Sequence, residues 1–169
     1  MTPTPFWPSA IWLFVVATAI HNLEETIWLP SWRGSRPLPW TKIPVDRFVF
    51  GFAANSLSVL FFLFGVLAVD AGPNSLGAYL ICGSALAMAL NVFFPHLAIS
   101  IWTRSYAPGA ATAALLVLPA SSVLIINSIQ DHYIDLATFM VTGPLTVLGL
   151  VISIPALFLV GRAMQKRRI

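Results

Sequence analysis

The stretch His21-Asn22-Leu23-Glu24-Glu25 places three ionisable side chains inside an otherwise apolar segment. His21, Glu24 and Glu25 stand at positions i, i+3 and i+4, so on a helix they are expected to share one face. A charge at the middle of a bilayer costs at least about 2.5–3.5 kcal/mol on insertion scales. This face is therefore predicted to look into a helix bundle, where protonation, a histidine partner or a cation accommodates the carboxylates.

A second histidine, His96, follows Pro95 in another apolar segment. Two carboxylates and two imidazoles without a basic partner at the same depth indicate a divalent metal. We expect His21, Glu25 and His96 to bind one ion, because two imidazoles and one carboxylate are typical of hydrolytic zinc sites. The same ligand set also suits non-haem iron, so zinc is the favoured cofactor and iron the alternative. A di-iron site is disfavoured, because it needs about four carboxylates.

In this interpretation Glu24 is the general base that activates water at the metal, although Glu24 and Glu25 could exchange roles. His21, Glu24 and Glu25 are thus the catalytic candidates. Four further polar residues are expected at the same level, where they could orient ligands or bind substrate: Asn55, Asn91, Tyr106 and Thr112. Pro95 cannot donate to the carbonyl of Asn91, which predicts a kink that turns His96 toward the bundle axis.

The elements that must position these residues follow from composition. Of the 169 residues, 58% are hydrophobic and 9% charged, whereas a soluble domain carries about a quarter charged residues. The lipid bilayer is therefore the expected solvent. The sequence predicts one all-α transmembrane domain over residues 1–169, because five segments are long enough to cross about 30 Å of hydrocarbon. They are residues 8–30, 46–69, 76–103, 108–130 and 138–162. The first lacks a basic start, so we do not expect a cleaved signal peptide.

The basic residues predict the orientation of the chain. With five spans, every Lys and Arg falls on one side: Arg33, Arg36, Lys42, Arg47, Arg104, Arg162, Lys166, Arg167 and Arg168. By the positive-inside rule, the N-terminus is outside and the C-terminus cytoplasmic, in the cell (inner) membrane. His21 then lies about 14 Å below the cytoplasmic end of its helix, and His96 about 10 Å below.

The chain resembles the HXXEE-domain family of small bacterial membrane proteins. The resemblance rests on the five-residue motif at 21–25 and on a second signature: Asn91, four residues, His96, nine residues, Tyr106-x-Pro108-Gly109-x-x-Thr112. The two motifs span about half of the chain, and no motif position departs from the pattern. The resemblance marks these residues as important without implying an activity.

The function expected from these residues is a metal-dependent, hydrolase-like enzyme that acts on a lipid or another hydrophobic substrate. A metal-free acid–base enzyme, such as a lipid isomerase, and a small proton- or ion-coupled transporter are the alternatives, since the same cluster could relay protons. A further alternative is a structural role, in which buried His–Glu hydrogen bonds fix the packing of the helices. The expected partners are the bilayer and the substrate, with no nucleic acid; a homo-oligomer remains open.

Overall fold

The computed structural model describes residues 7–32 and 46–167, whose regular elements are all helices. Within these two ranges, five helical segments are long and apolar enough to cross a membrane: Pro8–Ser31, Arg47–Ala71, Leu76–Thr103, Ala110–Gln130 and Leu136–Lys166. The predicted five-span, all-α architecture is therefore confirmed. The largest difference in boundaries is at the end of the last span, which reaches Lys166 instead of residue 162.

Two of the spans contain local distortions. The first span is α1 (Trp7–Trp28) with one 3-10 turn, η1 (Leu29–Ser31), and the second is α2 (Arg47–Ala71). The third consists of α3 (Leu76–Asn91), the distorted segment η2 (Val92–Leu97) and α4 (Ala98–Thr103). The fourth consists of α5 (Ala110–Thr112), a wide turn η3 (Ala113–Val117) and α6 (Leu118–Gln130), and the fifth is α7 (Leu136–Lys166).

Side-chain caps start three of these helices. Asp46, Ser75 and Asp135 each accept a hydrogen bond from the backbone N–H three residues further on, at 2.9, 3.2 and 2.7 Å. Such caps satisfy amides that have no partner within the first helical turn. Helix α2 ends at Ala71, and the capping residue Gly72 has a φ of +76°, which suits glycine. Polar residues at the helix ends thus define the limits of long apolar runs.

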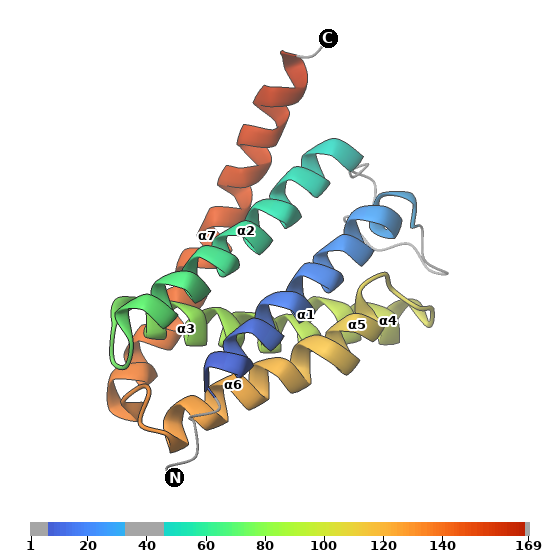
Figure 1. The fold of residues 1–169 in the computed structure, drawn as a ribbon. Helices are drawn as coiled ribbons and strands as arrows, with labels where there is room; N and C mark the ends of the chain where they lie inside the picture. Colours follow the sequence, from blue (N-terminus) through green and yellow to red (C-terminus); the bar gives the residue numbers. More distant parts are fainter. Residues whose placement is uncertain (1–6, 33–45, 168–169) are drawn as a thin grey trace.

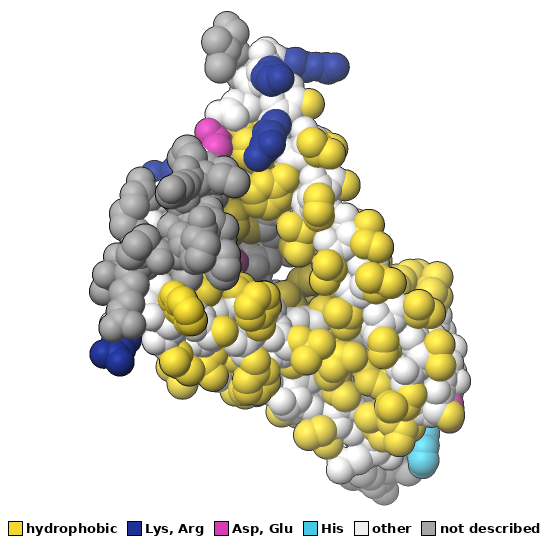
Figure 2. Space-filling view, turned by 180° about the vertical axis from the view of Figure 1, so that it is seen from behind, with side chains coloured by type: hydrophobic (Ala, Val, Ile, Leu, Met, Phe, Trp, Pro, Cys, Tyr) yellow, Lys and Arg dark blue, Asp and Glu magenta, His cyan; other side chains and the backbone are white. Residues whose placement is uncertain are grey.

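Helix α3 lies in the middle of the bundle, against α2, α6 and α7, while α1 packs on α2 and α6. Large apolar side chains fill the space between these helices, among them Ile11, Phe14, Phe61, Ile81 and Leu124. The C-terminal half of α7 projects beyond the other helices (Figure 1). The described part of the face seen from behind is largely hydrophobic, with Lys and Arg mainly near the C-terminal end of α7 (Figure 2). This surface is what a bilayer-embedded protein requires.

Hydrogen bonds fix which connections share an end of the bundle. The Asn74 N–H donates to the Tyr133 carbonyl at 2.8 Å, so the turns after α2 and α6 lie together. At the opposite end, the Gln165 amide donates to Asp46 at 2.8 Å, and the Trp32 indole donates to the Tyr106 carbonyl at 2.8 Å. This agrees with the alternation assumed from the sequence, but which end faces the cytoplasm stays a prediction.

The basic residues that the structure describes all lie at this second end or on the last turns of α7 that lead to it: Arg47, Arg104, Arg162, Lys166 and Arg167. The remaining four, Arg33, Arg36, Lys42 and Arg168, lie outside the described residues.

Candidate metal centre

The third span kinks at Pro95, as the sequence predicts. Phe94, directly before the proline, has φ −136° and ψ 119°, values of extended backbone inside the segment η2. A residue before proline is pushed out of the helical region, because the proline ring clashes with its backbone. His96 follows the kink and is buried, with 4% of its surface exposed. The kink thus presents His96 to the interior of the bundle.

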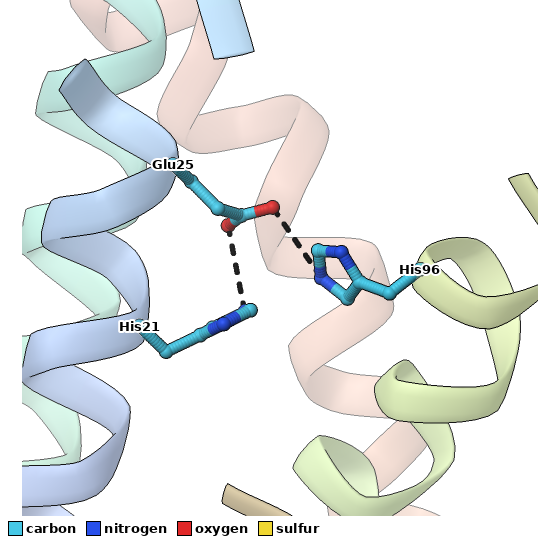
Figure 3. A group of neighbouring side chains, drawn as sticks. All are labelled: His21, Glu25 and His96. Atoms are coloured by element: carbon cyan, nitrogen blue, oxygen red, sulfur yellow. Dashed lines mark ion pairs between the residues drawn. The ribbon is translucent and has the colours of Figure 1, made fainter. Parts of the chain in front are cut away.

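Three ionisable side chains meet between α1 and η2 (Figure 3). Nε2 of His21 lies 3.7 Å from one carboxylate oxygen of Glu25, and Nε2 of His96 lies 3.4 Å from the other. The two imidazoles stand nearly perpendicular, with ring centroids 4.7 Å apart. One ligand atom from each of the three residues lies within 4.8 Å of the other two. The structure therefore brings together the predicted ligands His21, Glu25 and His96.

The donor atoms of this cluster have the chemistry of a cation site. Nε2 of His21 and Nε2 of His96 are buried and have no hydrogen-bond partner, although buried polar atoms in proteins nearly always have one. At zinc–ligand distances of about 2.0–2.2 Å, the donors of a tetrahedral site lie roughly 3.3–3.6 Å apart. The two Glu25–histidine distances are close to this spacing, so an ion held by the three residues would satisfy both orphaned nitrogens.

Gly109 closes one side of the cluster. A Cβ atom at this position would lie 2.7 Å from Cε1 of His96, 2.9 Å from Cγ of Glu25 and 3.0 Å from Cε1 of His21. The first two separations are shorter than real Cβ contacts, and the third is tighter than most of them. Gly109 also has φ +89°, a backbone conformation that side chains disfavour. Only glycine can therefore pack its backbone against all three side chains here.

Glu24 points away from the cluster, toward the segment between the third and fourth spans. Its Oε1 accepts hydrogen bonds from the Tyr106 hydroxyl and, at 3.0 Å, from the Gly109 N–H. Its Oε2 accepts from the Thr112 hydroxyl at 2.5 Å. His21, Glu24 and Glu25 were expected to share one helix face, but Glu24 and Glu25 point in different directions, because adjacent residues on a helix are about 100° apart. Glu25 faces His96, and Glu24 holds residues 106–112.

Thr112 links Glu24 to the cluster. Its hydroxyl oxygen lies 3.0 Å from Nδ1 of His21. A hydroxyl has a single proton, and the shortest contact gives that proton to Glu24. Nδ1 of His21 must then donate to Thr112, which leaves the lone pair on Nε2. His96 forms a hydrogen bond with the backbone of Pro108. Such contacts set the tautomer of ligating histidines in metal sites.

Tyr106 lies in the connection between the third and fourth spans, and the residue is 55% exposed. Partial burial and the hydrogen bond to Glu24 raise the pKa of its phenol above the ordinary value. The hydroxyl therefore stays a proton donor to Glu24 throughout the neutral range. Tyr106 supports the site from outside and does not touch the three predicted ligands.

Two predicted supporting residues lie apart from the histidines. Asn91 ends α3 and lines a cavity together with Glu25. Asn55 is exposed on α2, where its amide donates to the Gly51 carbonyl at 2.7 Å and to Thr26 at 3.4 Å. Asn55 is thus not brought to the cluster, because the buried face of α2 is set by other residues.

Two residues that the sequence reasoning did not assign to the site contribute to it. Gly109 was noted only as a motif position. Asn22, between His21 and Leu23, is buried and donates to the Ala54 carbonyl at 3.1 Å and to Ser58 at 2.9 Å. These bonds dock α1 on α2 and fix the rotation of the helix that carries the cluster. An amide inside an apolar helix was the available signal for Asn22.

The fold and this cluster define a polytopic membrane protein with a buried His–Glu–His centre. Comparison with known proteins gives its family: the chain belongs to the family described as "Protein of unknown function with HXXEE motif", whose model matches residues 12–124. This range contains all the residues of the cluster and of its support.

The chain is 31% identical over 150 residues to "Uncharacterized protein YrkK" of Bacillus subtilis (strain 168), and the match covers 88% of this chain and 92% of the relative. No solved structure matches the chain.

Proposed function

We propose that this protein is a metal-dependent enzyme of the cell membrane, with His21, Glu25 and His96 as the ligands of one divalent cation. The observation that carries the proposal is the pair of buried, unpartnered Nε2 atoms on either side of the Glu25 carboxylate. Zinc suits this ligand set best, and ferrous iron also accepts two histidines and one carboxylate. The descriptions of the family and of the relative name no activity, so the proposal rests on the cluster.

Three protein ligands leave a zinc ion able to take water or substrate in a fourth position. When bound, the cation would supply Lewis acidity and activate water, which favours hydrolysis of an ester-like bond. In this proposal Glu25 is the ligand, whereas Glu24 is a positioning residue, because its oxygens accept from Tyr106, Gly109 and Thr112. The general-base role first considered for Glu24 would require it to leave these donors.

The location of the cluster restricts the substrate. We place the basic end of the bundle in the cytoplasm by the positive-inside rule, so Glu25 lies about 8 Å below that surface. A water-soluble substrate would have to enter the membrane to reach it. We therefore propose a hydrophobic or lipid-like substrate.

Elemental analysis of the detergent-purified protein tests the proposal. We expect about one zinc or iron per chain in the wild type and loss of the metal in His96→Ala. His132→Ala is the matched control, because His132 is an exposed histidine in the turn after α6, and it should keep the metal. Metal-free wild type that also fails to take up added zinc would contradict the proposal and favour a metal-free acid–base enzyme.

A further inference from the structure

A cavity of about 370 Å³ begins at Glu25 and extends between α2, α3 and α7. Its polar lining is confined to Asn22 and Glu25 on α1 and Asn91 at the end of α3. The walls contributed by α2 and α7 are apolar and include Leu57, Phe61, Leu150 and Ile154. We call this space the chain cavity. It is amphipathic, with the Glu25 carboxylate on its polar wall.

The chain cavity is elongated. Along α2 its lining extends from Phe50 to Phe61, and eleven residues of helix rise about 16 Å. Along α7 it extends from Val147 to Phe158, over the same number of residues. Its volume lies in the range of small-molecule sites, about 300–1,000 Å³. A long, apolar space of this size suits one extended hydrocarbon chain better than a compact polar metabolite.

The chain cavity is open toward the lipid. Phe94 at the kink and Ile154 on α7 belong to its lining and are 71% and 41% exposed. Seen from behind the bundle, the surface is hollowed beside α7, and hydrophobic side chains form the described part of the rim (Figure 2). A hydrocarbon chain can therefore enter sideways from the bilayer without crossing water.

The charges near the chain cavity restrict the head group of its occupant. Among the described residues that line it, none is Lys or Arg. A divalent cation at the cluster would be balanced by the two carboxylates Glu24 and Glu25. An anionic head group would then bring an uncompensated charge to about 8 Å below the membrane surface. An ordinary phospholipid also keeps its head group at the surface, so bulk lipid is not the expected occupant.

We propose that the chain cavity holds a single-chain amphiphile with a small, neutral, oxygen-bearing head group, such as a long-chain ester or alcohol. The hydrocarbon chain of the amphiphile lies against α2 and α7, and its head group lies at Glu25 and Asn91. This inference rests on the proposed function in two respects, the assignment of the head group to the bound cation and the neutrality of that head group; the place of the hydrocarbon chain does not depend on it.

Photolabelling tests this assignment. The probe is a long-chain fatty alcohol with a diazirine at the far end of its chain, added to the protein in lipid nanodiscs. We expect labels on the apolar walls, at residues such as Leu57, Phe61 and Leu150, and competition by unlabelled fatty alcohol or isoprenoid alcohol. Labels spread over the lipid-facing surface that neither alcohol displaces would overturn the proposal.

Two variants that fill the chain cavity sharpen the test. Ala87→Phe and Val147→Phe add bulk to its wall without touching the cluster, so each should lower competed labelling at least tenfold while zinc binding is unchanged. Leu115→Phe is the control, because Leu115 is 74% exposed and lies outside the cavity; it should label as the wild type does. Undiminished labelling in either folded filling variant would contradict the proposal.

The outcomes separate this inference from the proposed function. If the cavity walls are labelled, unlabelled alcohol displaces the label and the protein binds no zinc, the result would support the chain cavity and contradict the metal site. If the protein binds zinc but the cavity walls show no label that unlabelled alcohol displaces, only the proposal for the chain cavity would be contradicted.

Discussion

Nδ1 of His21 lies 3.0 Å from the hydroxyl oxygen of Thr112, across the contact between α1 and α5. Because the Thr112 proton goes to Glu24 at 2.5 Å, the imidazole must donate, and its Nε2 carries the lone pair that faces Glu25. The chain Glu24–Thr112–His21 thus sets the histidine in the tautomer that binds a cation. In the proposed metal site the two adjacent glutamates have different tasks: Glu25 binds the cation, and Glu24 orients the ligand His21.

Removing the Thr112 hydroxyl should weaken metal binding without unfolding the protein. Thr112→Val keeps the shape of the side chain but removes the hydroxyl that accepts from Nδ1 of His21, and loss of such a support costs roughly 10- to 100-fold in affinity. Competition with a chelator measures the change. Thr146→Val is the matched control, because Thr146 on α7 bonds only to the Thr142 carbonyl in its own helix. Equal metal affinity in Thr112→Val and wild type would show that the hydrogen bonds from Glu24 through Thr112 to His21 do not affect metal binding.

The two glutamates should respond differently to amide substitution. Glu25→Gln removes the only carboxylate between the imidazoles, so we expect no stoichiometric zinc. Glu24→Gln places an amide group among the donors Tyr106, Gly109 and Thr112, which should loosen the 106–112 segment and reduce affinity without abolishing it. Isothermal titration with zinc in detergent measures both. A reversed order, with Glu24→Gln metal-free and Glu25→Gln normal, would exchange the assigned roles.

A methyl group at Gly109 should disrupt the centre. In Gly109→Ala the new Cβ would lie 2.7 Å from His96 and 2.9 Å from Glu25, at a φ of +89°, so we expect a loss of stability of about 1–3 kcal/mol together with loss of zinc. Thermal unfolding with and without zinc measures both effects. In Gly149→Ala, the control, nothing lies within 4 Å of the added Cβ, and no destabilisation is expected. A Gly109→Ala protein with normal melting and normal zinc affinity would contradict the close packing.

Tyr106 should contribute to stability in a pH-dependent way. Burial and the bond to Glu24 raise its pKa in the folded state, so the folded state holds the phenol proton more tightly than the unfolded state does. The contribution is fully present below the unfolded pKa of about 10 and is lost as the pH rises through the higher folded value. The difference in melting temperature between wild type and Tyr106→Phe should therefore be constant near neutrality and shrink in alkali. A difference that stays constant at high pH would contradict the assigned hydrogen bond.

Much of the architecture was predictable from local sequence. Long apolar runs fix the number of spans, because each run must find about 30 Å of hydrocarbon. Pro95 fixes a kink at Phe94, because proline restricts the residue before it. The ligand set His21, Glu25 and His96 could be predicted because few ionisable residues occur within the spans, and burial forces them toward one another.

The remainder depends on how the helices rotate about their axes. Asn55 was expected at the cluster from its depth alone, but Asn22 docks on Ala54 and Ser58 and leaves Asn55 on the exposed side. The separation of Glu24 from Glu25 depends on where residues 106–112 lie, which depth along α1 does not specify. The contact of Gly109 with three side chains is likewise a tertiary relationship, and only the glycine itself hinted at a close approach.

X-ray absorption spectroscopy of the zinc-loaded protein tests the shared site most directly, because it counts imidazole ligands on the ion. We expect a four-coordinate zinc with two histidines and one carboxylate in the wild type, and one histidine in His96→Gln if the ion is retained at excess zinc. A wild-type spectrum with no imidazole scattering, or one that His96→Gln leaves unchanged, would contradict a site shared by His21, Glu25 and His96.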